Sequence, residues 1–298
     1  MKVIAIDNLS QGEKRNIAPF FDNKNFKFLK IDVRDEQLIK KIKDEKIDYI
    51  VHLAAFKIPR YSDSMDTLMV NSEGTKNMLE IAKNKKAKFV FASTSDVYGK
   101  NKELPFREDS NLVLGPSTVK RWAYASSKIF DEHMCFAYGE RYGVESVILR
   151  FFGGYGPNQN LTWWGGPQSV FIECALKNIS IPLHGNGKQT RSFTYISDTV
   201  EGIYRAMTKN LGGVEIFNIG NNREITIKEL GEMIWKKIRG SKPKFNFIPY
   251  DKLSKGYQDV ERRIPDISKA FKILGFKALI PLEKGLIPTI EWQRRFVK

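Results

Sequence analysis

Short apolar runs alternate with longer segments of helical spacing through the first half of the chain. Strands are expected at residues 3–6, 25–32, 47–55, 87–94 and 145–152, where apolar or alternating stretches have strand length. Between them, residues 35–46, 65–84 and 124–143 repeat apolar positions every three or four residues, which predicts helices. This alternation is typical of an α/β domain with a parallel sheet and helices on both faces.

The rhythm changes near Gly153–Pro157, where "GGYGP" opens a stretch rich in glycine and proline. We therefore expect a larger domain over residues 1–152, with a later contribution from about residues 190–220. A smaller C-terminal lobe is expected over residues 153–298, with a helix near residues 226–238.

The composition argues against several classes of function. The chain has 298 residues, 42% of them hydrophobic, and no apolar run reaches the ~18 to 20 residues of a membrane helix. No secretory signal is visible, so we expect a cytoplasmic protein with no membrane association. The net charge of +15 is spread along the chain without a nucleic-acid-binding motif, which favours anionic small molecules over nucleic acid. Cys135 and Cys174 lack metal-ligand spacing, so no metal is expected.

One pair of residues points to chemistry. In "RWAYASSKIFDEH", Tyr124 and Lys128 lie four residues apart on an expected helix, so their side chains share one face. A nearby ammonium favours the phenolate and is expected to lower the tyrosine pKa, which would make Tyr124 an acid and base near neutral pH. The strand "KFVFAST" ends at Thr94, and the carboxyl edge of such a sheet is where ligands bind.

At these residues the chain resembles the extended short-chain dehydrogenase/reductase superfamily, with its nucleotide-sugar epimerases, dehydratases and decarboxylases. The resemblance runs through "VIAIDNLS", "HLAAFKIPR", "NSEGTKNMLE", "ASTSDVYG", "YASSK", "LRFF", "GNGKQTRSFTYISD", "FNIG" and "RRIPDISKA". It implies a Rossmann-like doubly wound parallel sheet, a smaller C-terminal α/β substrate-binding lobe, and NAD as cofactor. In such enzymes NAD removes a hydride from a sugar carbon. The resemblance implies that Tyr124 takes the hydroxyl proton, Thr94 hydrogen-bonds that oxygen, and Lys128 holds the nicotinamide ribose.

The resemblance also assigns further contacts. Asp7 matches the carboxylate that binds the adenosine ribose and should repel a 2′-phosphate, so NAD is expected rather than NADP. Arg191 matches the arginine that binds the nucleotide diphosphate, a task suited to a bidentate donor. The other positions that match cofactor contacts are Asn8, Asp32, Val33, Lys57 and Asn71.

The chain departs from the family at its start. Members begin with a strand and a GxGxxG loop that holds the pyrophosphate, but the first seventy residues hold one glycine, Gly12. The absent strand would lie in the middle of the sheet, between the strands at residues 3–6 and 49–53. Three explanations are open: the true start lies upstream, the two flanking strands pair directly, or the chain borrows a partner. We expect a shortened version of a longer enzyme.

Three further positions bear on the reaction. Gly153 stands where many relatives have an asparagine that touches the sugar nucleotide. Asp96 follows Ser95 where decarboxylases have a glutamate and 4,6-dehydratases an aspartate–glutamate pair, which argues against dehydration. Asp96 is therefore either a catalytic carboxylate or a loop cap. Arg263 matches an arginine that assists a uronic acid in decarboxylases, although similar segments occur in epimerases.

The resulting hypothesis is an NAD-dependent 4-epimerase of a nucleotide sugar, a UDP-hexose, acting through a 4-keto intermediate. The alternative enzyme is a UDP-glucuronate decarboxylase. An alternative of another class is a cofactor-free relic or interaction protein. The resemblance also implies a homodimer formed through paired helices.

Overall fold

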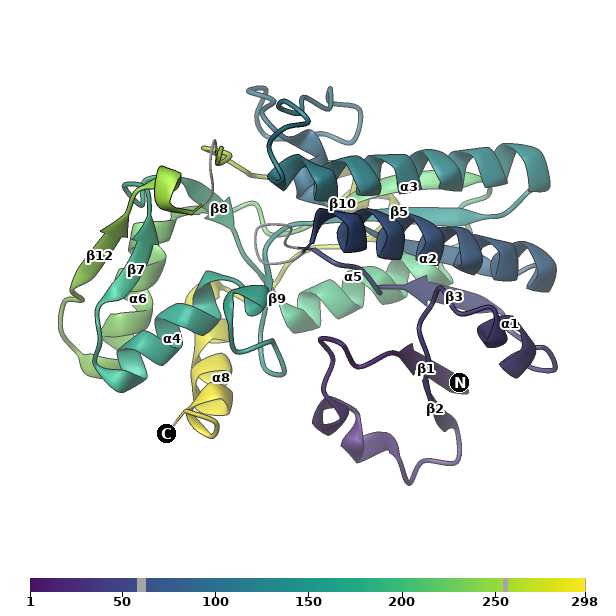
Figure 1. The fold of residues 1–298 in the computed structure, drawn as a ribbon, viewed down its shortest axis with the longest axis horizontal. Coiled ribbons are helices and arrows are strands. Elements are labelled where there is room, and N and C mark those ends of the chain that lie inside the picture. Colours follow the sequence, from purple (N-terminus) through teal and green to yellow (C-terminus); the bar gives the residue numbers. More distant parts are fainter. Residues whose placement is uncertain (58–62, 254–256, 298) are drawn as a thin grey trace.

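A four-stranded parallel sheet lies at the centre of the computed structural model, which describes residues 1–57, 63–253 and 257–297. The strand order is β10–β5–β4–β3, and every neighbouring pair is parallel. The strands are β3 (Tyr49–His52), β4 (Lys88–Thr94), β5 (Ser146–Phe151) and β10 (Val214–Ile219). The expected α/β class with a parallel sheet is confirmed (Figure 1).

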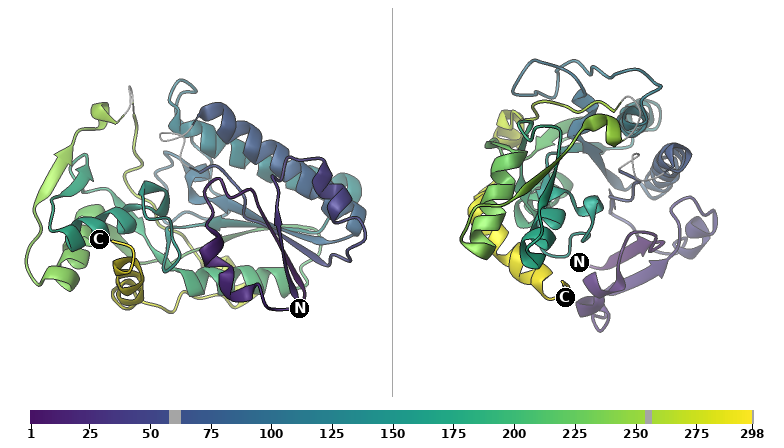
Figure 2. Two further views of the ribbon diagram at one scale, coloured as in Figure 1. Left: turned by 60° about the horizontal axis from the view of Figure 1, so that its bottom comes forward. Right: turned by 60° about the vertical axis from the view of Figure 1, so that its left-hand side comes forward.

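Helices cover both faces of this sheet, as the left-hand view of Figure 2 shows. One face carries α2 (Ser64–Lys85) and α3 (Arg121–Tyr142), and the other carries α5 (Ile196–Thr208) and α7 (Ser268–Leu274). Successive strand residues point to opposite faces, so Phe89 and Phe91 pack under α2 and α3 while Val90 packs with α5 and α7. Such burial on two faces explains the nearly continuous apolar runs of the sequence. None of the described helices combines the length and the apolar character that crossing a membrane requires.

The first two strands form a separate parallel pair. In this pair β1 (Val3–Asp7) bonds to β2 (Phe26–Lys30), and the short helix α1 (Gln37–Lys41) follows. Over the described residues, no ladder joins β1 to β3. The alternative in which these two strands pair directly is therefore not what the structure shows. Val3 on β1 and Tyr49 on β3 are 45% and 41% exposed.

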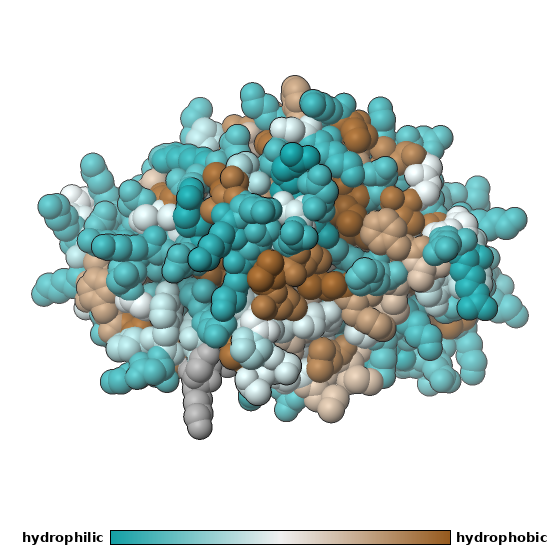
Figure 3. Space-filling view, turned by 90° about the horizontal axis from the view of Figure 1, so that it is seen from above, coloured by the Kyte–Doolittle hydropathy of each residue, from teal (hydrophilic) through white to brown (hydrophobic). Residues whose placement is uncertain are grey.

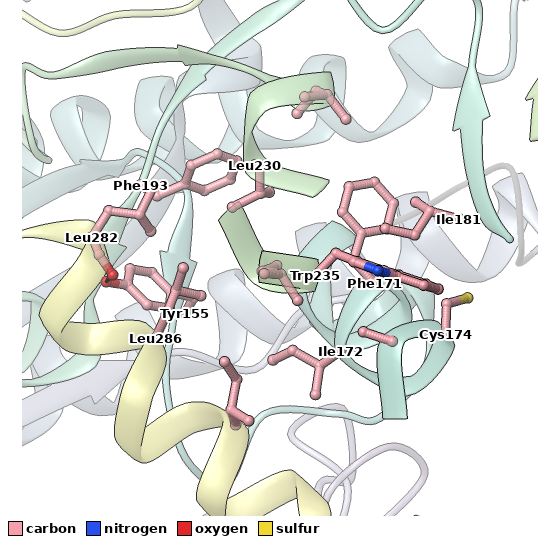
Figure 4. Close-up of a cluster of buried hydrophobic side chains, with 14 of the residues drawn as sticks. Tyr155, Phe171, Ile172, Cys174, Ile181, Phe193, Leu230, Trp235, Leu282 and Leu286 are labelled. Atoms are coloured by element: carbon pink, nitrogen blue, oxygen red, sulfur yellow. Dashed lines mark hydrogen bonds between the residues drawn. The ribbon is translucent and has the colours of Figure 1, made fainter. Parts of the chain in front are cut away.

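The smaller lobe has its own apolar core, drawn in Figure 4. Phe171 on α4, Leu230 on α6 and Leu286 on α8 are fully buried there. A capping box between Thr226 and Glu229 begins α6. The helices of this lobe are α4 (Pro167–Lys177), α6 (Ile227–Arg239) and α8 (Leu282–Arg294). Its strands are β6 (Gly154–Tyr155), β7 (Ile181–His184), β8 (Thr190–Ser192), β9 (Thr194–Tyr195), β11 (Glu224–Thr226) and β12 (Phe245–Ile248).

A buried ion pair fixes α3 against the sheet. The carboxylate of Glu132 on α3 accepts two hydrogen bonds from Arg150 on β5, at 2.9 and 2.7 Å. The Ser93 hydroxyl on β4 donates a further hydrogen bond to Glu132. The Glu132 and Arg150 side chains are only 6% and 4% exposed. The position of α3 relative to the carboxyl ends of β4 and β5 therefore depends on this pair.

Replacement of Glu132 by alanine should lower the free energy of unfolding by about 3–5 kcal/mol, because it leaves the Arg150 charge buried and unpaired. Urea unfolding followed by circular dichroism measures the loss. Glu140→Ala, at an exposed position of the same helix, should change stability by less than about 0.5 kcal/mol. Equal losses in the two variants would contradict the role given to the pair.

Candidate active site

A cleft of about 540 Å³ lies between the carboxyl ends of the central strands and the smaller lobe. From the sheet side it is lined by Thr94 and Asp96, and from α3 by Arg121 and Tyr124. The smaller lobe contributes the start of α4 and strands β7 and β8. Ligands of open α/β folds bind at this edge because the loops after parallel strands meet there.

Tyr124 and Thr94 meet in this cleft. The Thr94 side chain caps the short turn after β4 by accepting a hydrogen bond from the Asp96 amide, at 3.1 Å. Burial raises the pKa of Tyr124, the charge of Asp96 raises it further, and a hydrogen bond with the Thr94 side chain lowers it. The sequence predicts a lowered tyrosine pKa, whereas the structure gives a raised one. Burial and the charge of Asp96 outweigh the Thr94 hydrogen bond and the charge of Arg263, both of which lower the pKa of Tyr124.

Lys128 lies one helical turn from Tyr124, fully buried. Its ammonium sits 4.4 Å from the centre of the Phe91 ring and has no hydrogen-bond partner among the described residues. Burial lowers the pKa of Lys128, while the charge of Asp131 raises it. An unsatisfied buried ammonium needs acceptors. A pair of ribose hydroxyls would satisfy it, so this position fits the nicotinamide ribose.

Above Tyr124, arginines and aspartates form one ion-pair network. Asp96 accepts from Arg263 at 2.6 Å and from Arg121 at 3.2 Å. Asp259 accepts from Arg121 at 3.0 Å and from Arg191 at 2.9 Å. Three cations thus face two anions in a largely buried site. This net positive charge suits an anionic ligand.

The network keeps Asp96 ionised. Burial raises the pKa of its carboxyl, but the charges of Arg263, Arg121 and Arg191 outweigh burial and hold the pKa below its usual value. Burial lowers the pKa of Arg263 to about 10, which leaves it charged at neutral pH. Asp96 is therefore an ion-paired anion with no proton to give.

Sequence reasoning missed Arg121 and Asp259. Arg121 precedes Tyr124 by three residues, and Asp259 precedes Arg263 by four. The signal in the sequence was that each of these charged residues stands only three or four positions before a predicted site residue. Which carboxylate each arginine meets depends on how the segment around residue 259 crosses the cleft.

The residues expected to hold the adenosine end of the cofactor gather at the ends of β1 and β2. Asn8 donates to Asp32 at 2.8 Å. Arg34 donates two hydrogen bonds to Asp32, and mainly for that reason the pKa of Asp32 falls to about 2. The loop after β1 folds back so closely that a Cβ at Gly12 would lie 2.7 Å from a carboxylate oxygen of Asp7.

Three other predicted residues have different surroundings. Val33 is buried in the core against Gly74, and Lys57 lines the cleft. Asn71 is fully buried, and its amide group donates to the Phe56 carbonyl and to Ser127, while its oxygen accepts from the Phe56 amide. Asn71 thereby fixes the loop after β3. The assignment of these residues to cofactor contacts stays a prediction.

Backbone conformation and close packing explain why position 153 is a glycine. Gly153 has φ of +46°, and an added Cβ would lie 2.1 Å from the carbonyl oxygen of Ser192. A side chain cannot fit there. The asparagine of many relatives therefore has no counterpart at this position. Over the described residues, no group of three histidine, cysteine, aspartate or glutamate side chains is arranged to hold a metal ion.

The chain is similar to known enzymes that act on nucleotide sugars. Residues 1–288 match the family described as GDP-mannose 4,6 dehydratase. The chain is 33% identical over 295 residues to a UDP-N-acetyl-alpha-D-glucosaminuronate decarboxylase of Bacillus cytotoxicus, covering 98% of this chain and 90% of that protein. It resembles the structure of UDP-glucose 4-epimerase from Thermotoga maritima with UDP-glucose, at a TM-score of 0.87 and 29% identity, covering 100% and 92% of the two chains. UDP-glucuronic acid 4-epimerase from Bacillus cereus in complex with NAD gives a TM-score of 0.84 at 28% identity, with the same coverage.

Replacement of Asp259 by asparagine should destabilise the protein at neutral pH by about 2–4 kcal/mol, because Arg121 and Arg191 lose their shared anion. The neighbouring arginine charges hold the pKa of Asp259 below its usual value despite burial. Its stabilising effect is thus present above the unfolded pKa of about 4 and is lost as the pH falls.

Urea unfolding of the wild type and Asp259→Asn from pH 7 to pH 3 measures this effect, with the exposed Asp44→Asn as matched control. The difference between wild type and Asp259→Asn should be constant down to about pH 4 and shrink below it. A difference that does not change with pH would show that the charge of Asp259 is not the cause.

Proposed function

The chain belongs to the family of NAD-dependent nucleotide-sugar epimerases, decarboxylases and dehydratases, and from this premise we propose that it is a 4-epimerase of a UDP-hexose. The observation that carries the proposal is the hydrogen bond between Tyr124 and Thr94 in the cleft, with the buried Lys128 one helical turn from Tyr124 on α3. Such a site supports removal and return of a proton at a sugar hydroxyl. Epimerisation requires both.

The residues present fit both riboses of NAD. Lys128 would hold the nicotinamide ribose, because its buried ammonium has no hydrogen-bond partner among the described residues. Asp7, at the end of β1, would accept from the adenosine ribose, with Asn8 and Asp32 beside it. Bound there, NAD supplies the acceptor and donor of a hydride.

Tyr124 performs the proton transfers in this proposal. In its phenolate form Tyr124 takes the proton of the C4 hydroxyl as the C4–H bond breaks and becomes a neutral phenol, while Thr94 holds the same sugar oxygen by a hydrogen bond. The product is a 4-keto sugar. When the hydride returns to the opposite face of C4, Tyr124 gives the proton back to the oxygen, so protons and electrons balance. Lys128 supports both directions because its positive charge stabilises the phenolate.

The state of Asp96 argues against elimination of water as the outcome. Dehydration needs an acid to protonate the leaving hydroxyl, and Asp96 is held as an anion by Arg263 and Arg121. The hydroxyl of Ser95, the residue before it, is too weak an acid to protonate the leaving group. Simple return of the hydride needs no further acid.

A second candidate, a UDP-glucuronate decarboxylase, is favoured by the surplus of arginine charge in the cleft. Arg263 has a buried Nε without a hydrogen-bond partner among the described residues, and Arg121 has another. A sugar carboxylate would satisfy them. Oxidation at C4 then makes a β-keto acid, in which the bond to the carboxylate breaks and carbon dioxide leaves.

An assay with NAD and two substrates, UDP-glucose and UDP-glucuronate, separates the two candidates. The proposed epimerase forms UDP-galactose from UDP-glucose, which nuclear magnetic resonance of the anomeric proton detects. Release of carbon dioxide from UDP-glucuronate, without conversion of UDP-glucose, would replace the epimerase by the decarboxylase. Tyr124→Phe is the matched control, and turnover should fall by about 10²–10⁴-fold with little change in substrate affinity.

Calorimetric titration with NAD tests the alternative of another class. Saturable binding that weakens in Lys128→Met supports an enzyme. Absence of binding would favour a cofactor-free relic or interaction protein, in which the fold is kept without turnover.

We further propose that two copies associate through α2 and α3. Large apolar side chains are exposed on both helices, namely Met65, Leu68 and Met69 on α2 and Phe130 and Phe136 on α3. Figure 3, which views the molecule from above, shows apolar side chains gathered among hydrophilic ones. Contiguous exposed apolar patches commonly mark interfaces.

Sedimentation equilibrium should therefore give twice the mass of 34.3 kDa. Phe130→Glu should shift the distribution toward monomers, because burial of the new charge opposes association. Ile273→Glu, at an exposed apolar residue of α7, should leave the mass unchanged. A monomer in the wild type would contradict the proposal.

A further inference from the structure

Three ionisable side chains form a stripe along α3. Tyr124, Lys128 and Asp131 follow one another at intervals of four and three residues, so they lie on the same face of the helix. Asp131 is 0% exposed, and neither of its carboxylate oxygens has a hydrogen-bond partner among the described residues. A buried charge without a partner is costly, so its presence requires an explanation.

One neighbouring cation can compensate the buried charge of Asp131. On α3 itself it faces Lys128, Glu132 and Cys135, and from α2 it faces Thr75. Glu132 is occupied by Arg150 and has the same sign as Asp131. Among the described residues, Lys128 is therefore the one positive charge with a main effect on Asp131.

The groups around Lys128 also indicate that it pairs electrostatically with Asp131. Its ammonium faces the Phe91 ring and, from β3, His52. His52 is neutral, because burial and the Lys128 charge lower its pKa to about 3. The anions that act on Lys128 are Asp131 and Glu132, and Asp131 has the larger effect, whereas the Cys135 thiol is neutral because burial raises its pKa.

We propose that Asp131 is a positioning residue, whose carboxylate keeps the Lys128 ammonium on the same buried helix face charged, one turn from Tyr124. The catalytic pair is then a relay of three groups, in which Asp131 acts on the proton of Tyr124 through Lys128. This inference rests on the proposed proton transfer by Tyr124.

Physical chemistry gives the reason for such a third group. Burial of Lys128 favours the neutral amine, and a neutral amine cannot stabilise a phenolate. Burial raises the pKa of Asp131 to about 6, and the Lys128 charge opposes that shift. Each member of the pair therefore keeps the other ionised near neutral pH. Asp131 also raises the pKa of Tyr124 directly, but less than Asp96 does.

The test measures the pKa of Lys128 itself, without substrate or turnover. Lysines labelled with ¹³C at Cε are titrated by nuclear magnetic resonance, and the Lys128 signal is identified as the one missing in Lys128→Met. In Asp131→Asn the pKa of Lys128 should fall by about one unit or more, a tenfold change in the ratio of ammonium to amine. Asp131→Glu, which keeps the charge, should return it to within about half a unit of the wild type.

A second variant guards against misfolding of the first. Thr75→Val removes the hydroxyl that lowers the pKa of Asp131. The pKa of Asp131 should therefore rise, and the pKa of Lys128 should fall, as in Asp131→Asn. Glu140→Gln, on the exposed side of α3, is the control and should change nothing. An unchanged Lys128 pKa in both Asp131→Asn and Thr75→Val would overturn the proposal.

The result does not depend on the proposed function. A lowered Lys128 pKa in a protein without epimerase activity would show the electrostatic link and refute only the reaction. Where turnover is measurable, Asp131→Asn should move the alkaline limb of the pH–rate profile to lower pH by the same shift, whereas a merely structural loss would lower the rate at every pH.

Discussion

The burial of positive charge on α3 and β5 is the constraint on which the site depends. Arg150 can lie inside the sheet domain because the Glu132 carboxylate neutralises its charge and accepts two hydrogen bonds from it. That pair fixes the helix, and one turn earlier the same helix carries Lys128 into an equally buried position without a hydrogen-bond partner among the described residues. The first pair supplies rigidity, while the second charge is left available for a ligand. Preorganisation of this kind lets a site act without rearranging its own groups.

The sequence predicted the elements that depend on local pattern. Strand and helix periods placed the central sheet, and the spacing of four residues put Tyr124 and Lys128 on one face of α3. Hydroxyl groups were expected at the end of β4 because a strand end has a fixed place in such a sheet, and the family resemblance singled out Thr94 among them. These features follow from neighbours in the chain, which a pattern records directly.

Features that depend on distant segments could not be predicted in this way. The pairing of Asp259 with Arg121 joins residues 138 positions apart. The raised pKa of Tyr124 results from burial and from Asp96, and neither is visible in the spacing of Tyr124 and Lys128. The use of Asn71 to fix the loop at Phe56 likewise requires the fold. Interactions of this kind are decided by tertiary packing, where a charge has many possible partners and burial selects one.

Asp96 links the two charged systems of the cleft. Its charge raises the pKa of Tyr124, and the charge of Arg263 lowers that pKa. Arg263 is also the closest partner of Asp96, at 2.6 Å. A substrate carboxylate that drew Arg263 toward itself would add a negative charge near Tyr124 and weaken the neutralisation of Asp96, so the tyrosine would become a poorer acid. A neutral hexose leaves the pair intact. The same arginine that would recognise a uronate therefore couples the charge of the sugar to the proton on Tyr124, and this coupling favours a substrate whose reacting ring is uncharged.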